Sequence, residues 1–203
     1  ALDAKKGKVV TQGWTSSTSE TPVERARALE GLVSEYLFTV VDKEGMLGGT
    51  DLEAVQAVVS ATGNKVVAAG GITTLDEVRA LDRMGASCQL GMAIYTGKLA
   101  LADCVVGLGD WDKVGDLVPV VAQDTAGQIL QCAHATPEAL HQTLTSGRAT
   151  YWSRSRRARE LDRVPVCARL GAGTGPRAEW RQRSTWAYPG PSSWTGRGPV
   201  AGP

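Results

Sequence analysis

The chain has few aromatic residues, no closely spaced cysteine pair and no long hydrophobic run. Aromatic residues make up 5% of its 203 residues, and its four cysteines, at positions 88, 104, 132 and 167, form no C-x-x-C motif. Only His134 and His141 could join them as metal ligands, so we expect no zinc site. The apolar runs Val55–Val59 and Val118–Ala122 fall far short of the ~20 residues that a membrane span needs.

An excess of charge of one sign is also missing. The 22 Lys and Arg residues nearly balance the 21 Asp and Glu residues, which gives a formal net charge of +1. Such a chain has no global field to attract nucleic acid or a membrane, so an anionic ligand must be held locally. The N-terminus shows no charged-then-apolar leader, and no disulfide motif is apparent. We therefore expect a cytoplasmic protein with reduced thiols.

The pattern that is present is one of repeated βα units. Hydrophobic residues make up 42% of the chain, which is enough for a core. Up to about residue 101, short apolar runs alternate with amphipathic stretches, as in a parallel sheet covered by helices. The predicted strands are Ala1–Asp3, Tyr36–Val41, Lys65–Ala69 and Ser87–Leu90. Three helix starts are predicted where a threonine precedes a glutamate by three residues, at Thr21, Thr50 and Thr74.

Two further regions follow the βα repeats. Residues 109–156 predict a small α+β unit, with strands at 118–122 and 128–133, a helix from Pro137 to about Ser146, and a strand at Tyr151–Arg156. After Arg157 periodicity ends, Gly, Pro and Trp accumulate, and no lysine occurs. This tail could bind a polyanion, could be a disordered extension, or could arise from a change of reading frame. We favour the last, and divide the chain at 1–108, 109–156 and 157–203.

Residues that directly follow the predicted strands are the candidates for chemistry. In parallel αβ folds the ligand lies at the carboxyl ends of the strands. Those ends carry Asp3, Thr39 and two glycine turns, Gly70-Gly71 and Gly91-Met92. A single glycine turn before a helix is usually only a tight connection. Two in succession match the phosphate site that often follows strands seven and eight of a barrel.

Several of the other polar and aromatic candidates have two interpretations. Asp3 could be a general acid or base, or a solvated carboxylate beside nearby lysines. Trp14 could pack on the rim of the sheet or stack on a planar ligand. For His134 and His141 we expect packed or exposed side chains without a partner.

Four stretches together resemble the phosphoribosylformimino-aminoimidazole carboxamide ribotide isomerases of histidine biosynthesis. They occur in the family's order and spacing across about half the chain: Ala1–Trp14, Thr39–Gly48, Ala69–Thr74 and Gly91–Gly97. The first and last favour the isomerase over the sister cyclase, which shares the glycine turns. The resemblance implies the C-terminal half of a (β/α)8 TIM barrel, acting on a phosphoribosyl substrate by an aldose–ketose (Amadori) rearrangement. It implies no metal or cofactor.

The resemblance also implies roles for individual residues. Asp3 matches the proposed acid and Thr39 a residue that positions the substrate. Trp14 matches an aromatic residue near the ligand ring. The distal phosphate site is matched by Gly70, Gly71, Gly91 and Met92. Glu44 and Met46 depart from the family's usual Asp and Thr.

The family's first four strands, with a partner Asp, find no match before Ala1. Half a barrel exposes sheet edges, so we expect self-association or pairing with a missing N-terminal half. Residues 109–156 resemble the start of phosphoribosyl-AMP cyclohydrolase, without its later metal motifs. The alternatives to an isomerase are a non-catalytic phosphate-binding or assembly remnant and a bifunctional fusion fragment.

Overall fold

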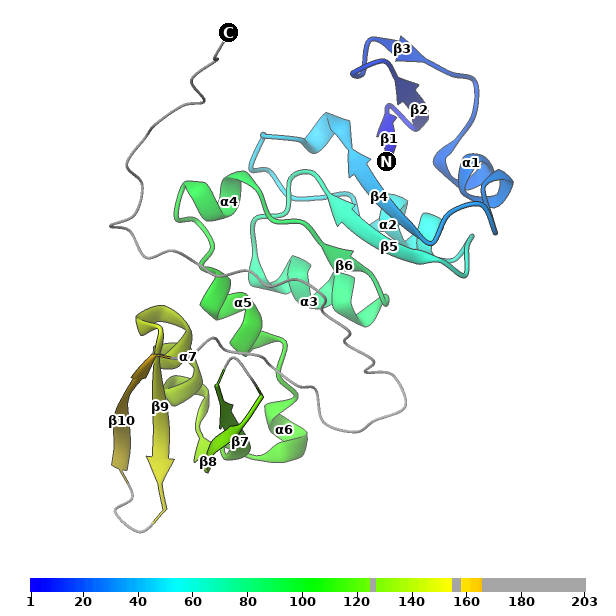
Figure 1. The fold of residues 1–203 in the computed structure, drawn as a ribbon. Coiled ribbons are helices and arrows are strands. Elements are labelled where there is room, and N and C mark those ends of the chain that lie inside the picture. The colour runs from blue at the N-terminus through cyan, green and yellow to red at the C-terminus, as the bar shows by residue number, and fades with distance from the viewer. Residues whose placement is uncertain (125–126, 155–157, 166–203) are drawn as a thin grey trace, which may run out of the picture.

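The computed structural model describes residues 1–124, 127–154 and 158–165, which form two β-sheets joined by short helices (Figure 1). The first sheet has six strands in the order β3-β2-β1-β4-β5-β6. These strands are β1 (Leu2–Lys5), β2 (Lys8–Thr11), β3 (Ser16–Ser17), β4 (Glu35–Val40), β5 (Lys65–Ala69) and β6 (Ser87–Cys88). The pairs β1·β4, β4·β5 and β5·β6 are parallel, which confirms the α/β class predicted from the sequence.

Three helices pack on one face of this sheet: α1 (Pro22–Ala28), α2 (Leu52–Val59) and α3 (Leu75–Arg83) (Figure 1). Alternate strand residues point toward them, since β4 buries Tyr36 and Phe38 in the shared hydrophobic core. The helices contribute Val55 from α2 and Leu81 from α3, both fully buried. The other face of the sheet therefore carries the intervening strand residues, among them Thr39.

Two of the three predicted helix starts are confirmed. Thr21 and Thr74 each cap a helix, and the glutamate three residues later completes a capping box. The prediction that Thr50 caps α2 is wrong, because the cap is Asp51, whose carboxylate accepts from the Ala54 amide at 3.0 Å. An aspartate next to a threonine offers an equally good cap, and the spacing rule cannot choose between them.

The segment after Asp3 forms a hairpin, so the predicted strand Ala1–Asp3 ends too early. Strand β1 continues to Lys5, turns, and pairs antiparallel with β2, which brings Asp3 opposite Val10. The lysines of this segment interrupt the alternation of apolar and polar residues by which a strand is recognised in a sequence. The predicted strand at Ser87–Leu90 is shorter than expected, since β6 ends at Cys88 and the chain turns at Gln89 toward the next helix.

A smaller α+β unit follows. Short helices α4 (Met92–Tyr95), α5 (Leu101–Gly107) and α6 (Trp111–Val114) lead to a four-stranded antiparallel sheet in the order β10-β9-β8-β7. Its elements are β7 (Val118–Gln123), β8 (Ile129–Ala135), α7 (Pro137–Ser146), β9 (Arg148–Ser153) and β10 (Ala158–Pro165). Helix α7 and strands β7 and β8 confirm the elements predicted in this region, whereas β9 begins three residues before the predicted Tyr151.

Strand β10 lies inside the region predicted to be an irregular tail, and that prediction is wrong for these eight residues. Its backbone pairs with β9, and ladder hydrogen bonds do not require a periodic sequence. The rest of the predicted tail, residues 166–203, lies outside the described residues. Within the described part of the chain no helix is both long and apolar enough to cross a bilayer.

Candidate functional site

A row of aligned residues crosses the carboxyl end of the parallel strands. The register places Asp3 beside Thr39, and Thr39 beside Ala69. With neighbouring strands about 4.8 Å apart, the row spans roughly 10 Å from Asp3 to Ala69. Thr39 is only 8% exposed, while Asp3 is half-buried. Two of the predicted catalytic residues therefore lie side by side, on the face that α1–α3 leave open.

Trp14 is held against the Asp3 end of this row. Its indole Nε1 donates to Asp3 Oδ2 at 2.9 Å, although the side chain is 42% exposed. Trp14 also has a φ of 70°, which a bulky residue rarely adopts. Within the described part of the chain, the other non-glycine residues with positive φ are Lys6, Gln12 and Leu47, in the loops after β1, β2 and β4. Lys6 and Leu47 lie at the sheet end that carries the predicted site, whereas Gln12 and Trp14 follow β2, which runs antiparallel to β1, and lie toward the other end.

The first glycine turn lies at the Ala69 end of the row, where backbones come too close for a side chain. A Cβ on Gly70 would lie 2.6 Å from the Val40 carbonyl oxygen, and one on Gly71 would lie 2.5 Å from the Gly49 carbonyl oxygen. Both glycines have positive φ, at 98° and 78°. The turn after β5 therefore requires glycine for packing as well as for conformation.

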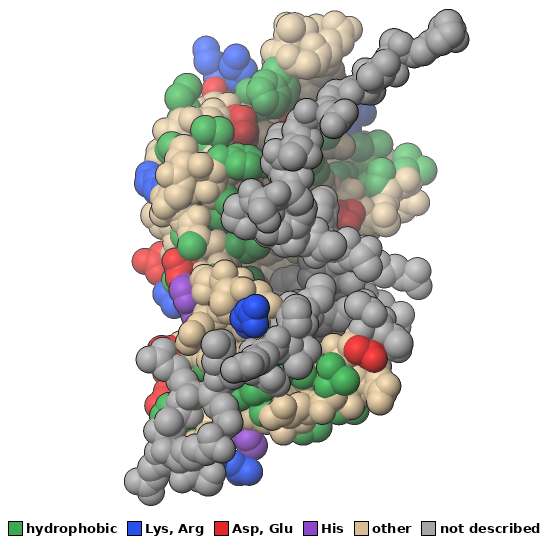
Figure 2. Space-filling view, turned by 60° about the vertical axis from the view of Figure 1, so that its left-hand side comes forward, with side chains coloured by type: hydrophobic (Ala, Val, Ile, Leu, Met, Phe, Trp, Pro, Cys, Tyr) green, Lys and Arg blue, Asp and Glu red, His purple; other side chains and the backbone are tan. Residues whose placement is uncertain are grey.

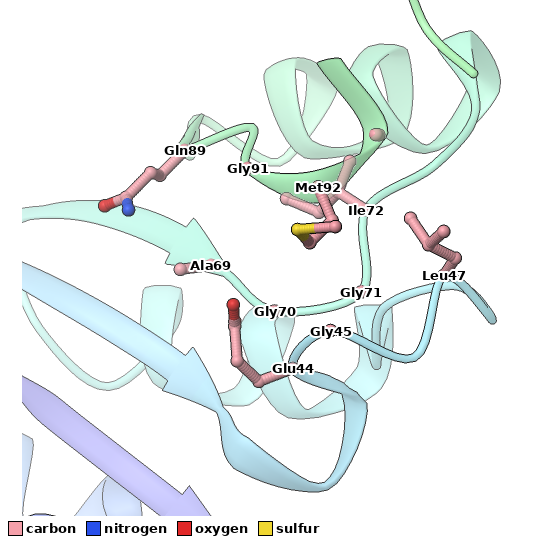
Figure 3. A pocket seen from close by; sticks show the side chains of 11 residues that line it. Glu44, Gly45, Leu47, Ala69, Gly70, Gly71, Ile72, Gln89, Gly91 and Met92 are labelled. Carbon is pink, nitrogen blue, oxygen red and sulfur yellow. The ribbon is translucent and has the colours of Figure 1, made fainter. Parts of the chain in front are cut away.

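A small pocket joins the two glycine turns (Figure 3). Its volume is about 30 Å³, and it is lined by Gly70, Gly71, Gly91 and Met92, all predicted from the sequence. A cavity of this size holds about two water-sized groups, so it cannot enclose a whole sugar phosphate. The first backbone amides of α4, which begins at Met92, have no partner within their helix and can donate to an anion.

An acidic side chain also lines this pocket. Glu44 extends from the loop after β4 toward Ala69 and Gly70, whereas Gln89 points away from the pocket (Figure 3). A carboxylate there opposes anion binding unless it turns away. Figure 2 shows acidic and basic side chains interspersed with hydrophobic ones on one face.

Glu77 connects the loop after β4 to the first glycine turn. Its Oε1 accepts from the Thr50 amide at 2.6 Å, and its Oε2 accepts from the amides of Thr73 and Thr74, each at 3.0 Å. Partial burial raises the pKa of this carboxyl, but the hydrogen bonds from Thr50, Thr73 and Thr74 outweigh it and the net pKa is lowered. The capping pattern in the sequence predicts the bonds of Glu77 to Thr74, but no local pattern predicts its bond to Thr50.

Among the described residues, no histidine or cysteine lines the pocket. His141 Nε2 lies 2.9 Å from Asp103 Oδ1 on the surface between α5 and α7, so the expectation that it lacks a partner is wrong. Burial, with smaller contributions from Cys104 and Asp82, raises the pKa of Cys88 to about 11. Across residues 1–124, 127–154 and 158–165 no three His, Cys, Asp or Glu side chains gather as metal ligands.

The parallel sheet, its helices and the paired glycine turns define the C-terminal half of a (β/α)8 barrel. Residues 1–100, just under half of the chain, match the family model described as "Histidine biosynthesis protein". The resemblance seen in the sequence motifs is thereby supported for the barrel region. The match ends before the segment predicted to resemble the cyclohydrolase.

Curated relatives of this region carry the name 1-(5-phosphoribosyl)-5-((5-phosphoribosylamino)methylideneamino)imidazole-4-carboxamide isomerase. The protein from Methanosarcina mazei is 37% identical over 113 residues, which are 54% of this chain and 46% of the relative. That from Methanosarcina barkeri is 40% identical over 103 residues, covering 50% and 42%. That from Halobacterium salinarum is 40% identical over 112 residues, covering 54% and 46%. The chain thus spans slightly less than half the length of these relatives.

Proposed function

We propose that residues 1–100 carry a phosphoribosyl isomerase half-site of histidine biosynthesis. The observation that supports this most is the continuity of the row Asp3–Thr39–Ala69 with the pocket between the two glycine turns. A sugar phosphate could place its phosphoryl group in the pocket and its ring over Thr39. Its reacting carbons would then lie near Asp3. The names of the relatives supply the substrate class, a phosphoribosylated imidazole carboxamide.

The proposed reaction is an acid–base rearrangement of an aldose to a ketose. Asp3 in its protonated form would donate to the ring oxygen of the phosphoribosylamine, which opens the ring. Ring opening leaves an iminium at C1, and a second carboxylate would then take the proton from C2 to give an enaminol. Protonation of C1 with loss of the C2 hydroxyl proton, which can return to Asp3, completes the aminoketose. The indole of Trp14 fixes the orientation of Asp3 through the 2.9 Å bond. Buried Thr39 lies next to Asp3 and can orient the sugar.

The second carboxylate has no matched residue in the four motif stretches. We propose that a second copy of this chain, or a separate N-terminal half-barrel, supplies it and closes the sheet. The alternative function is a phosphate-binding or assembly module without turnover. This alternative is favoured because the chain forms the whole pocket by itself but supplies only one member of the proposed acid–base pair.

The Asp3→Asn variant separates these two functions. Asparagine keeps an oxygen that can accept from Trp14, but it has no proton to give to the ring oxygen. We expect turnover of the relatives' substrate by the full chain to fall at least about 100-fold in the variant, as is usual for a lost general acid. Substrate binding should persist. The matched control is Asp82→Asn, on the exposed side of α3, which should retain full turnover. Binding without turnover in the wild type would support the alternative function.

For residues 109–156 we propose a cyclohydrolase-derived unit without cyclohydrolase activity. The order β7, β8, α7, β9 supports it as a small α+β unit. We expect no hydrolysis of phosphoribosyl-AMP by the full chain with zinc and magnesium added. Measurable hydrolysis would instead indicate the bifunctional fusion.

A further inference from the structure

The loop that follows β4 is fastened across the pocket by three long-range hydrogen bonds. The Thr50 amide donates to Glu77 at 2.6 Å, and the Gly49 amide donates to the Gly71 carbonyl at 3.1 Å. Lys98 Nζ donates to the Leu47 carbonyl at 2.9 Å. Segment 44–50, here called the β4 loop, is therefore bound both to the first glycine turn and to the segment that follows α4.

Glu77 has a position that its role as a helix cap does not explain. Glu24, the glutamate of the capping box on α1, accepts from Thr21 alone among the residues that the structure describes, at 2.7 Å from the backbone amide. Glu77 makes the same local bonds through Oε2 and uses Oε1 for Thr50, 27 residues earlier in the chain. Each oxygen of the Glu77 carboxylate thus serves a different segment.

The two segments that Glu77 joins both form the pocket. Glu44 and Leu47 of the β4 loop line it from one side, and Gly70 and Gly71 line it from the other. Leu47 has a φ of 51°, so the loop is held in a conformation that it would not keep by itself. The amides of Thr73 and Thr74 are occupied by Glu77, so a bound anion must use donors of the glycine turns.

We propose that Glu77 is a positioning residue for the phosphate site, holding the β4 loop against the first glycine turn so that the pocket is formed before the ligand arrives. This inference rests on the proposed phosphate-binding function. When the β4 loop is already ordered, no binding free energy is lost in ordering it, so the ligand binds more tightly.

The Glu77→Gln variant breaks this connection selectively. A glutamine amide has one accepting oxygen and one donating NH₂ group, so it cannot accept from both segments. The oxygen is expected to stay with the two amides of Thr73 and Thr74, which leaves the NH₂ group facing the Thr50 amide. The cap on α3 then survives, while the β4 loop is released.

The experiment is a titration of the full chain with inorganic phosphate, followed by amide chemical shifts, with Glu24→Gln as the matched control. We expect Glu77→Gln to weaken phosphate binding about tenfold, as for loss of one hydrogen bond to a charged group. Glu24→Gln should bind as the wild type does. Amide hydrogen exchange should accelerate at Thr50 in Glu77→Gln and remain slow there in Glu24→Gln, which a purely capping role would not produce.

The possible results separate the two claims. Equal phosphate affinity in Glu77→Gln and the wild type would overturn the positioning role and leave the phosphate site intact. Unchanged exchange at Thr50 would overturn it as well, whatever the affinity. Failure of the wild type itself to bind phosphate would overturn the proposed site, and the positioning role with it.

Discussion

Individual backbone positions at the first glycine turn decide whether the pocket can form. Gly71 and Gly85 have nearly the same φ, 78° and 81°, but different surroundings. A Cβ on Gly71 would lie 2.5 Å from the Gly49 carbonyl oxygen and 2.8 Å from Lys43 Cβ, whereas a Cβ on Gly85 meets nothing within 4 Å. The two positions therefore separate conformational strain from steric overlap.

We predict that Gly85→Ala lowers the free energy of unfolding by about 1–2 kcal/mol, the cost of a left-handed non-glycine residue. Gly71→Ala adds a clash with backbone, and its total cost should be roughly 2–4 kcal/mol. Urea unfolding of both variants measures the difference. Equal losses in the two variants would mean that the β4 loop does not pack on Gly71 as described.

The carboxylate of Glu77, in the capping box of α3, makes the stability of the fold depend on pH. Hydrogen bonds lower the pKa of Glu77 below its ordinary value of 4.5, despite the opposing effect of burial. A lowered pKa in the folded state means that folding favours the charged form. The stability that Glu77 provides is therefore fully present above about pH 4.5 and is lost as the pH falls through the folded-state pKa.

We predict that Glu77→Gln is less stable than the wild type by about 1–2 kcal/mol at pH 7, the contribution of a hydrogen bond to a charged group. The difference should shrink as the pH falls below 4.5, because protonated Glu77 resembles glutamine. Chemical unfolding between pH 3 and pH 7 measures this. A difference that is independent of pH would show that the Glu77 charge does not stabilise the fold.

Sequence reasoning found elements wherever local chemistry marks them. The capping boxes at Thr21 and Thr74 and the apolar strand Lys65–Ala69 were located correctly. Strand β2 was missed because it is defined by its pairing with β1. Its two end residues, Lys8 and Thr11, are polar, which leaves only two valines as a strand pattern. Strand β10 was missed because its partner β9, and not its own pattern, defines it.

The site was predictable to the same extent. The glycine turns can be recognised in the sequence, and both line the same pocket. The bonds Asp3–Trp14 and Thr50–Glu77 join residues 11 and 27 positions apart, and a single sequence contains no signal for such contacts. The register of parallel strands, which aligns Asp3 with Thr39, likewise comes only from tertiary packing.

At the scale of the whole molecule, the parallel sheet has room for further strands. β1 pairs with β4 only from Phe38 to Val40, whereas β5 pairs with β4 from Glu35 to Thr39. At the other end, β6 is an edge strand of two residues. Edge groups of this kind invite pairing with another chain.

We therefore predict self-association of the full chain through the edges of the parallel sheet. Sedimentation should show a mass that rises from monomer to dimer with concentration. Ser87→Lys, a change at an exposed position of the edge strand β6, should shift the equilibrium toward monomer by introducing charge. A strictly monomeric wild type across micromolar to millimolar concentration would contradict pairing of half-barrels.

The central claim is that the carboxyl end of the parallel sheet binds a sugar phosphate through the glycine turns. The most direct test compares ribose 5-phosphate with ribose, by mapping amide chemical shifts on the full chain. We predict that ribose 5-phosphate shifts the amides of Gly71 and Met92 while ribose shifts neither. Equal responses to both sugars, or shifts confined to residues outside the two glycine turns, would contradict the account.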